Sequence, residues 1–120
     1  VWTKEACATI LIHEALHADY NHNTEKWVIE TTERLGVDRS ELNWKYDPVA
    51  DEMVLDDSID QEYNAFVQEL ELWKEIKGAQ SNQELDYLLT LYDADIANGS
   101  DLLYQEIYSR YRAIGDYPDY

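Results

Sequence analysis

Cysteine is nearly absent from this chain of 120 residues, in which Cys7 is the only one. A single cysteine excludes an intrachain disulfide framework and any metal site built from several thiolates. Glycine and proline are also scarce, with 4 and 2 residues, so few positions interrupt regular structure. The low glycine content excludes most forms of the glycine-rich phosphate-binding loop, and no G-x-S-x-G motif of a serine hydrolase occurs.

Basic residues are few as well: 9 Lys and Arg stand against 26 Asp and Glu, which gives a formal net charge of −17. Phosphate backbones and anionic lipids repel such a chain, so we expect neither nucleic acid nor a membrane surface as partner. The longest apolar run, residues 8–12, ends at His13 and is far shorter than the roughly 20 residues that span a bilayer.

The sequence shows no signal peptide and begins with Val1 rather than Met. We therefore expect a piece of a longer protein, and the compartment stays open.

Hydrophobic residues make up 45% of the chain, enough for a core, and its length predicts one domain. Helical spacing of apolar residues and candidate cap residues predict about five helices. They cover approximately residues 3–19, 24–35, 58–77, 81–98 and 100–114, and residues 38–57 are the least regular. We thus predict an all-α, mainly helical domain over residues 1–115, without an identified strand, and a frayed tail over residues 116–120.

The segment from His13 to His17 reads His-Glu-Ala-Leu-His and matches the motif H-E-x-x-H. Residues four apart lie on one face of a helix, so the two imidazoles can bind one metal ion. Glu14 lies about 100° further round the helix and can reach a water on the metal without being a ligand. The spacing therefore predicts Zn²⁺ ligands in His13 and His17 and a general base in Glu14.

Two neighbouring stripes of this helix are otherwise apolar or small: Ala6, Ile10, His13 and His17 on one, Cys7, Leu11, Glu14 and Ala18 on the other. We expect both stripes to face the core, with Cys7 as a small buried side chain. The alternative is a pair of core histidines bonded to the backbone, with Glu14 at the rim.

A catalytic zinc site needs a third protein ligand. The metzincin spacing would require Gly at position 20 and His at position 23, where this chain has Tyr20 and Asn23. His22 is one position out of that register, so it is a weaker candidate. Half of a di-iron site, Glu14-x-x-His17, also fits locally, but the chain has no second E-x-x-H.

The better third ligand is Glu62, which borders the predicted buried face of the helix over residues 58–77. That face carries Ile59, Tyr63, Phe66, Leu70 and Trp73. A carboxylate there is costly to bury unless it is paired or binds a metal. Asp60 lies on a more polar side and is the second choice, and Glu62 could instead reach out to water.

The pattern His13-Glu14-x-x-His17 followed by Glu62-Tyr63-Asn64-Ala65-Phe66 resembles the gluzincin type of zincin metallopeptidases. The second block is also similar to the E-x-N-x-F-A stretch of ImmA/IrrE-like peptidases. The resemblance implies that His13, His17 and Glu62 bind Zn²⁺, that Glu14 is the catalytic base, and that a peptide or protein is the substrate. It also implies that the chain is the helical part of a zincin-like domain whose small sheet lies upstream.

The chain departs from those families at two positions: Phe66 stands where an Asp or Asn often orients a ligand histidine, and Val67 replaces the last Ala. Three other acidic residues are candidates for that orienting role: Glu30, Glu33 and Asp51. The tyrosines nearest to the motifs, Tyr20 and Tyr63, are candidate hydrogen-bond donors to an oxyanion. Two alternative functions stay open, a catalytically inactive zincin-like protein and an acidic helical module that binds a basic partner protein.

Overall fold

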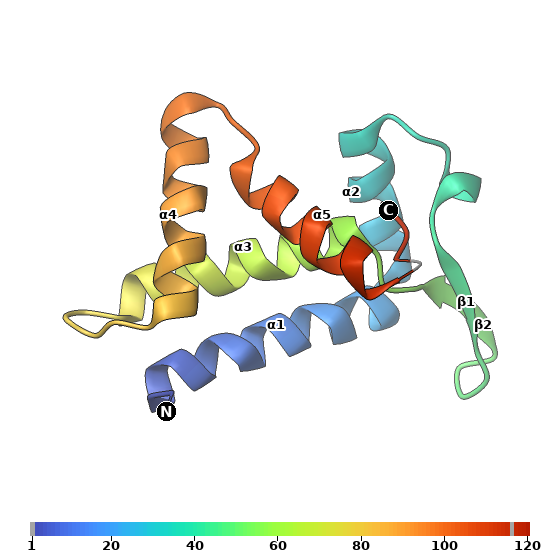
Figure 1. Ribbon diagram of the computed structural model, residues 1–120. Coiled ribbons are helices and arrows are strands. Elements are labelled where there is room, and N and C mark those ends of the chain that lie inside the picture. The colour runs from blue at the N-terminus through green and yellow to red at the C-terminus, as the bar shows by residue number, and fades with distance from the viewer. Residues whose placement is uncertain (1, 116) are drawn as a thin grey trace.

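The computed structural model describes residues 2–115 and 117–120, and it confirms the mainly helical class (Figure 1). Its helices are α1 (Lys4–His22), α2 (Thr24–Leu35), α3 (Ile59–Ile76), α4 (Gln83–Asn98) and α5 (Leu102–Ile114). A short 3-10 helix (Arg39–Glu41) and the strands β1 (Trp44–Asp47) and β2 (Glu52–Leu55) lie between α2 and α3. Within the described ranges, every helix is too short or too polar to cross a membrane.

The helices α1 and α3 lie side by side, and α4 and α5 pack on α3 (Figure 1). One hydrophobic cluster joins α3, α4 and α5 and includes Ala6 of α1. A second cluster joins α2 and the strands to the end of α1, where Tyr20 stacks on Trp27 at 4.2 Å between ring centroids. Helix α1 therefore contributes to both clusters through the buried residues Ala6 and Tyr20, and the two histidines of the H-E-x-x-H motif lie between these two residues in sequence.

Cap residues mark the ends of several helices close to the predicted ranges. The Thr3 hydroxyl accepts a hydrogen bond from the Ala6 amide at 3.2 Å, and the Ser58 hydroxyl accepts one from the Gln61 amide at 3.1 Å. Gly36 ends α2 with φ at 68°, a left-handed conformation that glycine adopts without a steric penalty. The Thr3 and Ser58 caps fix the first residues of α1 and α3. These are the two helices that carry the H-E-x-x-H motif and Glu62.

Three helices differ from their predicted ranges: α4 begins at Gln83 rather than near residue 81, α5 begins at Leu102 rather than near residue 100, and α1 continues past residue 19 to His22. Asn82, rather than Ser81, caps α4, because its side-chain oxygen accepts from the Leu85 amide at 3.0 Å. Asp101, rather than Ser100, precedes α5, since the Ser100 hydroxyl donates instead to Asp95 at 2.6 Å.

Residues 38–57 contain an antiparallel hairpin that the sequence did not predict. Trp44 pairs with Leu55 and Asp47 with Glu52, and the turn begins at Asp47-Pro48. Each strand has only four residues, too few to show a clear alternation of polar and apolar side chains. Burial of Val54 and Leu55 anchors the hairpin to the rest of the chain.

The outward face of α1 contradicts the prediction of two buried stripes. Cys7 and Glu14 are exposed, and Leu11 is 72% exposed. Helix α1 packs on α3 through one face only, which includes the buried Ala6 and Thr9. Because small and apolar residues occur on both sides of α1, their spacing could not select the face that becomes buried.

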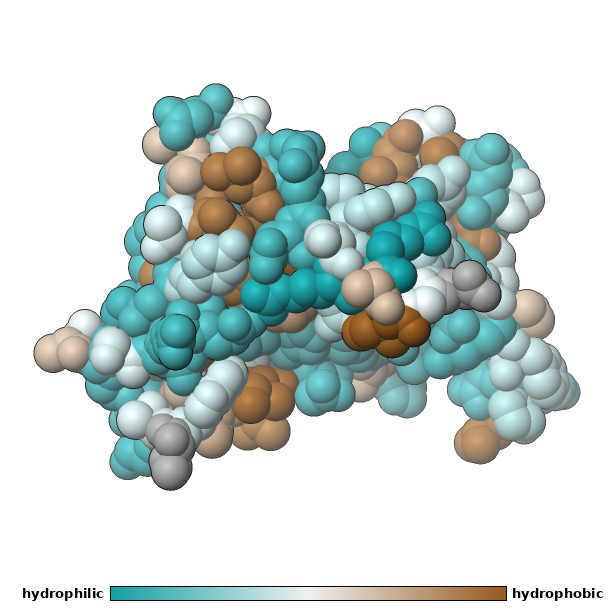
Figure 2. Space-filling model, viewed as in Figure 1, coloured by the Kyte–Doolittle hydropathy of each residue, from teal (hydrophilic) through white to brown (hydrophobic). Residues whose placement is uncertain are grey.

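Figure 2 shows one face of the molecule, on which hydrophilic residues cover most of the area and hydrophobic residues form separate patches. This distribution agrees with the excess of 26 acidic residues over 9 basic ones. Most of these charges are solvated, which is the usual environment of a carboxylate outside a functional site.

The predicted frayed tail is also wrong for residues 117–120, whereas residue 116 lies outside the described residues. The amide of Ile59 donates to the Pro118 carbonyl at 2.8 Å, and the amide of Asp60 donates to the Asp119 carbonyl at 3.0 Å. The first amides of a helix lack partners within the helix. Residues 117–120, which we call the C-terminal strap, therefore complete the first turn of α3.

An ion pair between the exposed Arg34 of α2 and the buried Asp60 of α3 connects these two helices. Burial raises the pKa of Asp60, although the Arg34 guanidinium opposes the change. Replacing Arg34 with Met would leave the carboxylate buried without its partner. We expect the free energy of unfolding to fall by about 1–3 kcal/mol, measured by urea denaturation.

The double variant Arg34→Met/Asp60→Asn is the matched control for this prediction. We expect it to recover part of the loss, because the uncompensated charge is gone. Equal stability of wild type and the Arg34→Met variant would show that the pair contributes nothing.

Candidate metal centre

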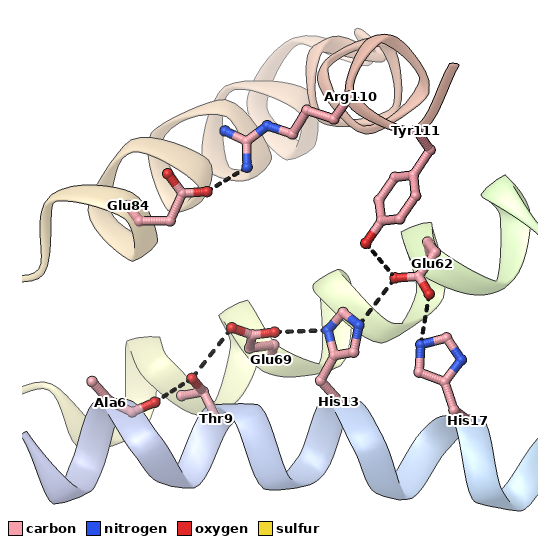
Figure 3. A network of polar contacts seen from close by, with 9 residues as sticks. All are labelled: Ala6, Thr9, His13, His17, Glu62, Glu69, Glu84, Arg110 and Tyr111. Carbon is pink, nitrogen blue, oxygen red and sulfur yellow. Dashed lines mark hydrogen bonds and ion pairs between the residues drawn. The ribbon is translucent and has the colours of Figure 1, made fainter. Parts of the chain in front are cut away.

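The residues that the sequence predicted as ligands come together between α1 and α3. Figure 3 shows His13 and His17 extending from α1 toward Glu62 on α3. The Nε2 atom of His13 lies 3.0 Å from one carboxylate oxygen of Glu62, and the Nε2 atom of His17 lies 2.8 Å from the other. One potential ligand atom from each residue lies within 4.8 Å of the other two. Glu62, rather than Asp60, faces the histidines, as expected.

All three side chains are largely shielded from solvent: the exposed fraction is 12% for His13, 17% for His17 and 7% for Glu62. A buried carboxylate needs compensation from charged or hydrogen-bonding groups. The ring nitrogens of both histidines face carboxylates rather than backbone carbonyls. The arrangement therefore differs from the alternative of core histidines bonded to the backbone.

The second nitrogen of each imidazole faces a further carboxylate. Glu69 lies 2.8 Å from Nδ1 of His13, and Asp57 lies 3.5 Å from Nδ1 of His17. In a neutral imidazole, a carboxylate at Nδ1 keeps the proton there and leaves the lone pair at Nε2. Both Nε2 lone pairs would then point toward the space beside Glu62, which is the orientation that a metal ligand requires.

Glu69 contacts His13 and was not among the residues predicted for the site. It lies on α3 one turn after Phe66, whose ring contacts that of His13 edge-on with 4.8 Å between centroids. Phe66 thus packs against the histidine, and Glu69 accepts the hydrogen bond. Thr9 of α1 donates to the other Glu69 oxygen at 3.3 Å. The sequence did contain one indication of its role: Glu69 lies seven residues after Glu62, which places the two carboxylates on the same side of α3.

The acidic residues proposed for this role lie elsewhere. Glu30 and Glu33 are exposed on α2, and Asp51 accepts a hydrogen bond from Tyr46 at the hairpin turn. Asp57, which does approach His17, belongs to the segment between β2 and α3. Its position depends on the hairpin, whose strands were not predicted.

Two tyrosines from the C-terminal part of the chain donate to Glu62. The hydroxyl of Tyr111 on α5 lies 2.8 Å from Oε2, and the hydroxyl of Tyr117 in the C-terminal strap lies 3.1 Å from Oε1. The tyrosines expected near the site are placed differently. Tyr20 is buried and accepts from the Asn64 side chain at 2.9 Å, and Tyr63 packs against Tyr104.

The electrostatic environment favours protonated histidines opposite ionised carboxylates. Burial lowers the pKa of His13, but hydrogen bonds to Glu62 and Glu69 outweigh it and raise the pKa to about 9. Hydrogen bonds to Asp57 and Glu62 raise the pKa of His17 to about 10. Burial alone would raise the pKa of Glu62, yet the two histidines hold it well below its usual range. These pKa shifts favour ion pairs between the histidines and the carboxylates at neutral pH.

Glu14 follows His13 directly in sequence on α1, and its side chain is exposed. His22, the weaker candidate ligand, is exposed in the last turn of α1. A groove of about 590 Å³ adjoins the cluster, and Asp57 and Tyr117 are part of its lining. The three candidate ligands are therefore shielded, while Glu14 is open to a molecule that approaches α1 from solvent.

Comparison of this chain with family models, curated proteins and solved structures finds no match.

Proposed function

We propose that this chain is a zinc-dependent metallopeptidase. The observation that carries the proposal is the convergence of His13, His17 and Glu62 within 4.8 Å, with Glu14 on the adjoining exposed face of α1. Two histidines and one glutamate are a known ligand set of catalytic zinc, which keeps a further position open for water or substrate.

The chemistry of the donor atoms fits a zinc ion. Both Nε2 atoms and a Glu62 oxygen face the same small space, and Glu69 and Asp57 face the two Nδ1 atoms. Carboxylates in that position orient ligand imidazoles and increase their basicity. His13, His17 and Glu62 would hold the ion, and Glu62 would compensate part of its charge.

When bound, zinc supplies a Lewis acid that polarises a scissile carbonyl and acidifies water. The carboxylate of Glu14 accepts the proton of the attacking water and passes it to the leaving amine. Its exposure allows contact with a substrate peptide without disturbance of the ion pairs around Glu62. The residues of the chain thus supply the ligands and the proton transfer.

Calorimetric titration of the metal-free chain with zinc tests the site through the protons it releases. Zinc replaces protons on His13 and His17, whose pKa values are about 9 and about 10. We expect one zinc per chain and release of about two protons at pH 7, against about half a proton for two imidazoles of ordinary pKa. The apparent affinity should rise as the pH approaches 9, because fewer protons compete with the metal.

Repeating the titration in buffers of different ionisation enthalpy gives the number of protons released for each zinc ion bound. Release of only half a proton would show that the histidines are not paired with carboxylates in the free protein. Absence of binding heat in every buffer would contradict the metal site itself.

A further inference from the structure

Glu62 is held from two opposite sides. The histidines of α1 approach its carboxylate from one side, and the hydroxyls of Tyr111 and Tyr117 donate to it from the other (Figure 3 shows Tyr111). Each carboxylate oxygen therefore accepts from one histidine and one tyrosine. A metal ion would take the place of the histidine protons, and the two tyrosine hydroxyls would remain as the donors that orient Glu62.

Both hydroxyls are suited to this role because each lies within hydrogen-bond distance of Glu62, at 2.8 Å for Tyr111 and 3.1 Å for Tyr117. The two rings also contact each other, with 4.8 Å between their centroids. This contact helps to hold each ring in its place beside Glu62.

The C-terminal strap that carries Tyr117 is fastened to the helix that carries Glu62. The carbonyls of Pro118 and Asp119 accept from the amides of Ile59 and Asp60 in the first turn of α3. Asp119 also pairs with Arg112 of α5 at 2.9 Å. The strap thus contacts α3 twice, through these backbone bonds at residues 59 and 60 and through the Tyr117 hydroxyl at Glu62.

We propose that Tyr111 and Tyr117 are positioning residues of the metal centre and that metal binding and docking of the C-terminal strap stabilise each other. The inference depends on the metal site proposed above. A docked strap fixes the Glu62 carboxylate in the orientation that the metal requires. By linkage, a metal ion on Glu62 stabilises the docked strap by the same free energy.

Cobalt titration of the full chain and its Tyr111→Phe and Tyr117→Phe variants tests the proposal. Phe keeps the ring packing and removes only the hydroxyl. We expect each variant to lose about 10- to 100-fold in Co²⁺ affinity, as residues that orient a ligand commonly do, with a changed visible spectrum of the bound cobalt. The Tyr87→Phe variant is the control, since Tyr87 is exposed on α4 and its loss should alter neither quantity.

Amide hydrogen exchange provides a second readout of the coupling. Zinc should slow exchange at Ile59 and Asp60, whose amides bond the strap, and it should do so less in the Tyr117→Phe variant. If wild type binds no cobalt, the metal site and the proposed function both fail. If wild type binds and both variants match it in affinity, spectrum and exchange, only the role of the tyrosines is overturned.

Discussion

Replacement of Glu14 with Gln should abolish zinc-dependent peptide hydrolysis while zinc stays bound. The amide is nearly the same size as the carboxylate but cannot accept the proton of the attacking water. General base catalysis contributes about 10²- to 10⁴-fold, so we expect kcat to fall by at least about 10²-fold. Glu14 is exposed and lies outside the His13, His17 and Glu62 cluster. We therefore expect zinc affinity to stay within about threefold of wild type, a smaller change than the loss of a ligand or of a residue that orients one would cause. A quenched-fluorescence peptide library and calorimetry measure the two quantities.

The Glu33→Gln variant is the control for this experiment, because Glu33 is an exposed glutamate on α2 and the charge change is the same. Hydrolysis that persists in the Glu14→Gln variant would remove Glu14 from the catalytic role. Zinc binding without cleavage of any library peptide by wild type would favour the alternative of a catalytically inactive zincin-like protein.

Replacement of Glu62 with Gln should weaken zinc binding by at least about two orders of magnitude, because one of the three protein ligands becomes a neutral amide. The variant also leaves the protonated histidines without their common partner, so the pKa values of His13 and His17 should fall toward the ordinary value. Calorimetry measures the affinity, and NMR titration of the imidazole protons measures the pKa values.

Asp60→Asn provides a matched comparison two residues away on α3. Asp60 pairs with Arg34 rather than with the histidines. We therefore expect the Asp60→Asn variant to bind zinc as wild type does and to differ in thermal stability. Equal zinc affinity of wild type and the Glu62→Gln variant would exclude Glu62 as a ligand and reopen the search for the third one. Zinc that shifts the melting temperature of neither protein would favour the metal-free interaction module.

The helices and most of their ends were predictable because their signals are local. Ser58 caps α3 and Gly36 ends α2 through interactions that span only a few residues. The hairpin of β1 and β2 depends on pairing across the turn and on burial of Val54 and Leu55 in the rest of the fold. Strands of four residues are too short to show a periodicity in the sequence.

The site was predictable to the extent that helical geometry determines it. The spacing of His13 and His17 and the position of Glu62 at the edge of a buried face were sufficient to group these residues. Tyr111 and Tyr117 lie 49 and 55 residues after Glu62. Only the tertiary packing of α5 and the C-terminal strap brings them to the carboxylate, so no local pattern could identify them.

The exposure of Cys7 makes the helix of the candidate ligands accessible to selective chemical labelling. Cys7 is the only thiol of the chain and points to solvent, about 9 Å along the α1 axis from His13. A nitroxide attached there would report its distance to a paramagnetic ion in the site from one known position. Because each chain has one cysteine, disulfide bonds between copies of this chain can link two of them but no more.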